Sequence, residues 1–248
     1  MHNYKFTVSY DGTRYSGLQS QGNTDNTIQG KISNVLSRMT NTSVEIIGAG
    51  RTDAGVHALE MTANAHFNTS LSEVEIRDYM NKYLPSDICI NDVSIVSERF
   101  HSRYNAIGKT YKYTCYIGKT KPIFDRNYVY ILEKEPDIDK MLAATEHLLG
   151  RHNFLCFCGN TKFNKSAVRT INSVKIEKHD DYITFTYHGD GFLQNMVRII
   201  TGTLIEIGYG MRTPDNMQDI ISSQKRNKAG FTAPACGLCL IKVDYASF

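Results

Sequence analysis

The sequence predicts an α+β fold. Its 248 residues fall into two stretches, and in each the expected order of elements is strand, helix, strand, strand, helix, strand. The helices place apolar residues three and four apart, and the strands alternate apolar and polar residues. This order is that of the split βαβ, ferredoxin-like motif. We therefore expect two such halves, residues 1–104 and 105–248, with a ligand site between them; one α+β domain with an accidental repeat is the alternative.

One well-marked helix anchors the first half. Asn26 and Gln29 form a capping-box pair at its start, and its apolar residues fall on one face. Segments with alternating patterns lie on both sides of it, as expected for strands that pack one face on a core. The expected elements are strands at 4–10, 43–49, 61–68 and 88–97 and helices at 27–40 and 72–83.

The second half repeats that order. Asp137 is the expected N-cap of its first helix, and Gly150 is the expected C-terminal stop. Residues 151–170 have no periodic pattern, and loops of this length in compact domains are usually functional or mobile. Cations and phenylalanines alternate in this loop, which suits a partly single-stranded nucleic acid, although an ordinary solvated loop explains the pattern equally well. The expected elements are strands at 110–118, 171–178, 181–188 and 237–244 and helices at 137–149 and 192–208.

Composition excludes several classes of protein. Hydrophobic residues make up 41% and charged residues 21% of the chain, which is typical of a globular protein. The net charge of +3 permits a polyanionic partner without requiring one. No apolar run is long enough to span a membrane, and the N-terminus alternates like a strand instead of forming a signal-peptide core. We expect a cytoplasmic protein that does not associate with membranes.

The six cysteines do not form an obvious site. A disulfide framework is not expected in a chain of this length without an export signal. Cys236 and Cys239 match a C-x-x-C pattern, which is found in redox pairs and zinc sites. They lie in a segment that reads as a strand, where side chains three residues apart point to opposite faces. We therefore expect that these cysteines do not hold a metal ion.

The densest chemical signal is the segment from Gly48 to His57, which contains three glycines. It is not a dinucleotide fingerprint, because Asp53 takes the place of the third glycine, and it is not a phosphate-binding P-loop. If the chain is extended here, Arg51 and Asp53 share a face, and the guanidinium would keep the carboxylate ionised, as a nucleophile requires. A turn with an ordinary surface ion pair is the alternative. His57 is a weaker candidate for a base, since a lone histidine in a turn is more often structural.

The helix expected at 192–208 carries one arginine away from its apolar stripe. At 100° per residue, Arg198 falls roughly opposite the apolar face. Either this arginine is solvated at the surface, or the helix lies beside a cleft and directs Arg198 into it.

Several blocks of sequence resemble one known family. The segment Arg51-Thr-Asp-Ala-Gly-Val-His-Ala58 matches the signature of the tRNA pseudouridine synthase A family, and the other blocks follow in the family's order across nearly the whole chain. These blocks are Tyr10-Asp-Gly12 with Tyr15-Ser-Gly17, Phe100-His-Ser-Arg103 with Ala106, Lys109-Thr-Tyr-Lys-Tyr113, Phe192 with Asn195-Met-Val-Arg198 and Gly202, and Ala233-Pro-Ala-Cys-Gly-Leu-Cys-Leu240 with Val243-Asp-Tyr245.

The resemblance implies an activity and three catalytic residues. Members of the family isomerise uridines 38–40 of the tRNA anticodon stem-loop to pseudouridine, without a cofactor or a catalytic metal. Asp53 aligns with the aspartate that attacks the nucleoside, and Tyr111 with the tyrosine that stacks on the target base. Arg198 aligns with the arginine that pairs with the catalytic carboxylate, and Arg51 with a residue that helps to hold the flipped nucleotide. A continuous mixed or antiparallel sheet with helices on one face, a basic central cleft and a homodimer are also implied.

We expect RNA to be bound through phosphates and through a flipped, stacked base. Besides Arg51 and Tyr111, the expected substrate-binding residues are Phe100, His101, Ser102, Arg103, Tyr104, Thr161, Lys162, Phe163, Asn164, Lys165, Arg14, Arg169 and Leu238.

The chain departs from the family pattern at two places. Leu18 stands where the family usually has tryptophan, and Glu60-Met61 stand where it usually has Gly-Gln. Neither departure falls on a catalytic position, so they bear on tRNA docking and on the choice of uridine. Two other functions compete with the main hypothesis. One is a catalytically silent or retargeted RNA-binding paralogue, and the other is an unrelated aspartate-nucleophile enzyme that acts on small molecules.

Overall fold

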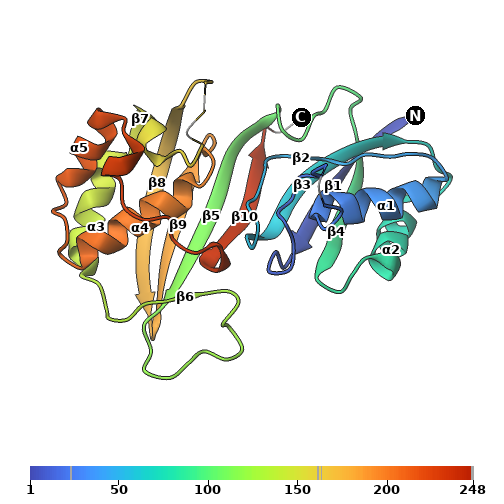
Figure 1. Ribbon diagram of the computed structural model, residues 1–248. Helices are drawn as coiled ribbons and strands as arrows, with labels where there is room; N and C mark the ends of the chain where they lie inside the picture. The colour runs from blue at the N-terminus through green and yellow to red at the C-terminus, as the bar shows by residue number, and fades with distance from the viewer. Residues whose placement is uncertain (23, 161, 163, 247–248) are drawn as a thin grey trace. The chain divides into compact units, whose positions relative to one another are not determined.

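The computed structural model describes residues 1–22, 24–160, 162 and 164–246. By its contacts the chain divides into two compact units (Figure 1). Unit 1 contains Met1–Ile107 and the C-terminal strand from Cys239 onward, and unit 2 contains Gly108–Leu238. Residues after Leu238 belong to the second half in the division expected from the sequence, and here they cluster with the first.

Unit 1 is built on a sheet whose strands are far apart in the sequence. Its central strand β1 (His2–Tyr10) pairs antiparallel with β3 (His57–Phe67) on one side and with β4 (Ile88–Val96) on the other. The short β2 (Ile47–Gly48) pairs antiparallel with β3, and β10 (Leu238–Tyr245) pairs parallel with the start of β3. The β10 pairing joins Cys239 to His57 and Leu240 to Ala58, so β10 holds the position at which β3 begins.

Two helices contact each other in unit 1, α1 (Ile28–Thr40) and α2 (Glu73–Tyr83). Both begin at a residue whose side chain accepts a hydrogen bond from the first turn, Thr27 for α1 and Ser72 for α2. Their apolar stripes are buried, as the helical spacing predicts. The core includes Phe6, Ile28, Ile32, Leu36, Met61 and Ile76.

Unit 2 contains a second group of antiparallel strands, in the order β5 (Ala106–Tyr116), β9 (Tyr182–Gly189), β8 (Val168–His179) and β7 (Gly150–Asn153). The short β6 (Tyr130–Ile131) pairs parallel with β5. The helices are α3 (Ile138–Thr145), α4 (Met196–Gly208) and α5 (Asn216–Ser223), and α3 contacts both α4 and α5. Figure 1 shows these three helices beside β8 and β9. The fold is α+β, as predicted.

Several boundaries differ from the sequence-based expectation. The cap of α1 is Thr27, because the Asn26 side chain instead donates to the Arg14 carbonyl. The strand expected at 43–49 shrinks to β2, since the hydroxyls of Ser37 and Ser33 accept the Val44 and Ile46 N–H groups that a strand partner would need. The buried side chains of Val44 and Ile46 keep the alternating pattern without the pairing.

The second half shows similar differences. The Asp137 cap is confirmed, but α3 ends at Thr145 and a 3-10 turn (Glu146–Leu148) follows before Gly150, which has a positive φ of 91°. Helix α4 begins at Met196 and not at 192, because Asn195 adopts a left-handed φ of 60°. Residues 151–170 include most of β7 and a 3-10 turn (Leu155–Phe157). Helix α5 was not expected, although its three buried residues have helical spacing.

Candidate active site

Asp53 lies on a loop between β2 and β3, at the start of the longest strand of unit 1. Its side chain is half-buried, whereas Thr52 and Val56 on either side are buried. The loop turns tightly: the Val56 N–H donates to the Asp53 carbonyl at 3.2 Å, and Gly55 takes a positive φ of 79° that a side chain would disfavour. The local sequence thus places one carboxylate at the solvent boundary between two buried neighbours.

A second segment of unit 1, the turn of residues 10–18, packs against this loop. The Tyr10 and Thr52 hydroxyls are 2.8 Å apart, and the Leu18 N–H donates to the Thr52 carbonyl at 3.2 Å. Gly17 has a φ of 97°, and a Cβ on it would lie 2.6 Å from that same carbonyl oxygen. The turn therefore fixes the backbone immediately before Asp53, and only glycine fits at position 17.

The structure shows where the Arg51 side chain lies relative to the pairing with Asp53 that the i, i+2 spacing allowed. Its side chain is exposed, and among the residues that the structure describes its guanidinium makes no hydrogen bond or ion pair. The ion pair that an extended chain would permit between Arg51 and Asp53 is therefore absent among the described residues.

Tyr111 lies on β5, in unit 2, and is opposite Tyr187 of β9. Its ring is buried and meets the Phe192 ring edge to face, with centroids 5.3 Å apart at 85°. Phe192 stands before α4, on one of the sequence blocks that matched the family. The structure thus brings two predicted blocks of unit 2 into contact at Tyr111.

Arg198 lies on the first turn of α4 and is partly buried, so it is not a solvated surface arginine. Its Nε donates to the Ala233 carbonyl at 2.7 Å, and its Nη1 donates to Asn195 Oδ1 at 3.0 Å. The next residue, Pro234, accepts a hydrogen bond from the buried Tyr113 hydroxyl at 2.8 Å. These contacts fix the plane of the guanidinium within unit 2.

The structure therefore adds residues that sequence reasoning missed. Asn195 orients Arg198, and its left-handed backbone conformation was not visible in the helical pattern. Burial raises the pKa of Tyr113 well above its ordinary range, so its hydroxyl remains a donor. Both residues belong to blocks that matched the family, and that was the only signal that could have found them.

The predicted substrate-binding segment 100–104 lies in unit 1 and divides into anchors and exposed side chains. Ser102 is fully buried: its N–H donates to Asn64 Oδ1 at 2.9 Å, its hydroxyl donates to the Ile47 carbonyl at 2.6 Å, and its carbonyl accepts from Tyr245. The Phe100 ring packs on the Tyr245 ring, 5.2 Å away. Phe100 and Ser102 thus support the segment through buried contacts.

The exposed part of that segment has the chemistry expected of an RNA contact. Tyr104 is 77% exposed, and its ring lies 4.2 Å from the partly exposed His101 ring. Arg103 is exposed beside them, with its backbone N–H donating to His101 Nδ1 at 3.1 Å. A cation next to two flat rings on a firmly held turn can contact a phosphate and a base together.

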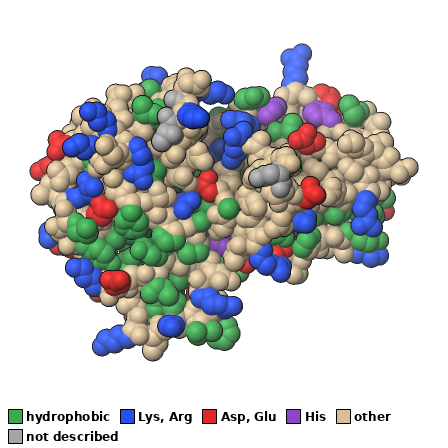
Figure 2. All heavy atoms as spheres, in the orientation of Figure 1, with side chains coloured by type: hydrophobic (Ala, Val, Ile, Leu, Met, Phe, Trp, Pro, Cys, Tyr) green, Lys and Arg blue, Asp and Glu red, His purple; other side chains and the backbone are tan. Residues whose placement is uncertain are grey.

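The other predicted substrate contacts are distributed over both units. Arg14, in unit 1, forms a 2.6 Å ion pair with Asp87, so part of its charge is already compensated. In unit 2, Lys162, Asn164 and Lys165 are exposed, Arg169 donates to the Ser166 and Val168 carbonyls, and Leu238 is buried at the start of β10. Thr161 and Phe163 lie outside the described residues. Figure 2 shows Lys and Arg side chains scattered over the visible face.

The two departures from the family pattern can be placed in unit 1. Leu18 is buried, and a Cβ on Gly48 would lie 2.6 Å from its Cδ2 atom, so the side chain fills space beneath the Asp53 loop. Met61 is buried in β3, and Glu60 is exposed. Neither departure falls on a predicted catalytic residue.

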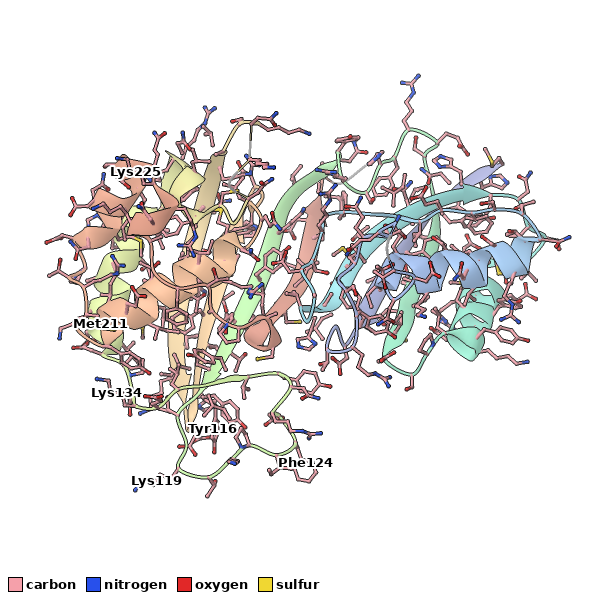
Figure 3. All side chains as sticks on the ribbon, in the orientation of Figure 1. Tyr116, Lys119, Phe124, Lys134, Met211 and Lys225 are labelled. Atoms are coloured by element: carbon pink, nitrogen blue, oxygen red, sulfur yellow. The ribbon has the colours of Figure 1, made fainter. Side chains whose placement is uncertain are left out.

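One exposed loop was not singled out by the sequence. It connects β5 to β6 and carries Lys119, Ile123 and Phe124, of which Phe124 is 90% exposed. Figure 3 shows Phe124 and Lys119 on this loop, pointing away from the strands.

The structure also bears on metal, redox and membrane chemistry. No disulfide joins any of the six cysteines, all of which are described, and the Cys236 and Cys239 thiols donate to different carbonyls, those of Val129 and Leu240. Burial raises the pKa of the Cys156 thiol to about 12, which makes it unreactive. Within the described ranges, no three His, Cys, Asp or Glu side chains form a group that could hold a metal ion, and no helix could cross a membrane.

Comparisons with known proteins agree with the motif. The family model for tRNA pseudouridine synthases matches residues 7–105 and 144–246. A tRNA pseudouridine synthase A of Bacillus sp. (strain KSM-64) is 45% identical over 99% of this chain and 100% of that protein. Proteins named tRNA pseudouridine synthase A 2 from Bacillus cereus (strain ATCC 14579) and Clostridium perfringens (strain 13) are each 42% identical over 99% of this chain and 100% of their own length.

A solved structure of a Cbf5-Nop10-Gar1 complex aligns with 96% of this chain and 49% of that chain, at 10% identity and a TM-score of 0.39. The family model and the sequence relatives show the family by themselves. The family model covers most of the chain, and relatives above 40% identity align from end to end. The chain belongs to the tRNA pseudouridine synthase family and is an isomerase.

Proposed function

We propose that this enzyme isomerises uridines 38–40 in the anticodon stem-loop of tRNA, with Asp53 as its nucleophile. The observation that carries the proposal is the placement of the family signature: Asp53 is the half-buried carboxylate of a loop in which Thr52 and Val56 are buried and hydrogen-bonded. A nucleophile needs access to its substrate and a fixed position, and this loop supplies both.

The reaction rearranges bonds within one nucleoside. The Asp53 carboxylate attacks the nucleoside, the bond from ribose C1′ to uracil N1 breaks, and the base turns. A new bond then forms between C1′ and C5, the bond between Asp53 and the nucleoside breaks and returns the free carboxylate, the C5 proton leaves, and N1 gains a proton. No atom is gained or lost overall, so the chemistry needs no oxidant or reductant. Because C5 loses its hydrogen, release of tritium from uracil C5 reports turnover directly.

Tyr111 and Arg198 act on the same uridine in this proposal. Tyr111 stacks on the base, and its hydroxyl takes part in the proton removal that completes the reaction; its ring is supported by Phe192. Arg198 aligns with the family arginine that pairs with the catalytic carboxylate, and we assign it that role toward Asp53. The bonds from Arg198 to Ala233 and Asn195 support this role, since they fix the guanidinium before substrate binds.

Binding of tRNA is expected to depend mainly on phosphates. The exposed cations Arg51, Arg103, Lys162 and Lys165 are the proposed contacts, and Arg51 in addition helps to hold the flipped nucleotide. The role of Arg14 is weaker than the sequence indicated, because Asp87 already pairs with it. Each phosphate contact adds about one unit to the slope of log affinity against log salt, so tRNA affinity should fall steeply between low and moderate salt.

We further propose that the enzyme works in the cytoplasm as a homodimer. Support for both comes from the resemblance to the family. Exposed apolar side chains on the β5–β6 loop, such as Phe124 and Ile123, are available for contact between copies. Sedimentation equilibrium over a range of concentrations tests the dimer, and a single species with the mass of one chain would contradict it.

A tritium-release assay on uracil-C5-labelled tRNA tests the function. Wild-type protein should release tritium from anticodon stem-loop positions, and Asp53→Asn should bind the same tRNA without releasing it. Binding by the wild type without release would instead identify an RNA-binding paralogue. Mapping pseudouridine in tRNA from cells that lack this gene should show losses at positions 38–40, and unchanged tRNA there would contradict the assigned positions.

A further inference from the structure

The loop that carries Asp53 is held at both ends by the same turn of unit 1. Before Asp53, the hydroxyls of Tyr10 and Thr52 form a buried hydrogen bond of 2.8 Å. After Asp53, the Gly12 N–H donates to Nδ1 of the buried His57 at 3.1 Å. Tyr10 and His57 therefore flank the proposed nucleophile without being part of its chemistry.

The Nδ1 atom of His57 has two polar neighbours, and the geometry decides which of them it bonds. Asp11 Oδ1 also lies 3.1 Å from His57 Nδ1, and one ring nitrogen cannot accept from Gly12 and donate to Asp11 at the same time. The Gly12 N–H is directed at Nδ1, and Asp11 Oδ1 already accepts from the N–H and the hydroxyl of Thr13. We therefore assign Nδ1 as the acceptor of the Gly12 N–H.

The fold does not need these two hydrogen bonds to pair its strands. The β1–β3 ladder runs from His2–Phe67 to Tyr10–Ala58 through backbone contacts, and β10 pairs with β3 at His57 and Ala58. The side-chain bonds are directed beyond this ladder, one to the Thr52 hydroxyl on the loop and the other to the Gly12 N–H in the turn. Their position indicates that they restrict where the loop lies more than whether the sheet forms.

We propose that Tyr10 and His57 are positioning residues that hold the Asp53 loop in its reactive place. This inference rests on the proposed role of Asp53. A displacement of about 1 Å in a catalytic group can cost about 100-fold in rate, so a small movement of the loop is enough to matter. Substrate binding depends on phosphate contacts elsewhere and should be nearly unaffected.

Variants at His57 test this with a matched pair. The Oδ1 atom of asparagine can occupy the place of Nδ1, whereas glutamine reaches to the place of Nε2 and leaves Gly12 without its acceptor. We expect His57→Gln to lower the single-turnover rate of tritium release by about 10- to 100-fold, with the Kd for tRNA changed less than about 2-fold. His57→Asn should keep most of the wild-type rate.

Tyr10→Phe provides a second test if the histidine variants fold poorly, because it removes a single oxygen atom and keeps the ring. We expect the rate to fall by about 3- to 10-fold, roughly the loss of one neutral hydrogen bond, again at constant Kd. Equal rates for His57→Asn, His57→Gln, Tyr10→Phe and wild type would overturn the inference. So would parallel losses of rate, affinity and melting temperature, which indicate a merely structural role.

Failure of this inference can be told from failure of the proposed function. If the wild type releases no tritium, or if Asp53→Asn still does, the assigned function is wrong. If the wild type is active, Asp53→Asn is inactive and the Tyr10 and His57 variants match the wild type, only the positioning role is wrong.

Discussion

Substitution of Gly12 by alanine should displace the Asp53 loop by an amount that the structure specifies. A Cβ on Gly12 would lie 2.0 Å from the Val56 carbonyl oxygen, and real contacts of this kind are essentially never below 3.0 Å. The turn that carries Gly12 and the loop that carries Asp53 must therefore move apart by at least the difference, about 1 Å. The clash is with backbone atoms, so rotation of a side chain cannot relieve it. A shift of about 1 Å in a catalytic group corresponds to about 100-fold in rate, or about 2.7 kcal/mol in activation free energy.

The single-turnover rate of tritium release from labelled tRNA measures this effect, with tRNA affinity and melting temperature recorded on the same preparations. Gly22→Ala is the matched control, because a Cβ at that position has no atom of the described residues within 4 Å and the glycine has no positive φ. We expect Gly22→Ala to match the wild type and Gly12→Ala to lose about 100-fold in rate while still binding tRNA. A wild-type rate for folded Gly12→Ala would refute the argument that this turn sets the position of Asp53.

Three further predictions follow from contacts within single units. Arg198→Lys should reduce turnover by about 100-fold, because one ammonium cannot replace a guanidinium fixed by two hydrogen bonds in different directions; unchanged kinetics would contradict this. Tyr111→Phe keeps the ring and should fold normally, but its tritium release should fall severely; a normal rate would show that the hydroxyl is dispensable. Burial alone would raise the pKa of Asp87, but hydrogen bonds from Tyr15 and Arg14 hold it below its ordinary value. Asp87→Asn should therefore cost about 1–2 kcal/mol of unfolding free energy at pH 7. That deficit relative to wild type should shrink as pH falls below about 4 and through the folded-state pKa, and urea titrations that show a constant deficit from pH 7 to pH 3 would exclude this role.

Local pattern was sufficient for most of the fold. The Asp137 cap and the strands near 4–10, 171–178 and 181–188 are present because alternation and capping depend on residues close in the sequence. The errors occur where a distant or unusual partner decides the outcome. Residues 43–49 alternate correctly, yet serine hydroxyls from α1 take the N–H groups that would have made a strand.

The candidate site divides in the same way. The blocks that resemble the family pointed to Asp53, Tyr111 and Arg198, but they could not show how each is held. The i, i+2 spacing suggested Arg51 as a partner for Asp53 in an extended chain. Among the described residues Arg51 forms no such pair.

By itself the sequence determined the α+β class, the order of most elements, the family and the residues proposed for catalysis. These depend on spacing and residue type along the chain, and both can be read directly. Only the tertiary structure decided that Tyr10 meets Thr52 across 42 positions, that Gly12 meets His57 across 45, and that Arg198 meets Ala233 across 35. Such contacts depend on strand register and on the conformation of whole loops, which no local pattern encodes.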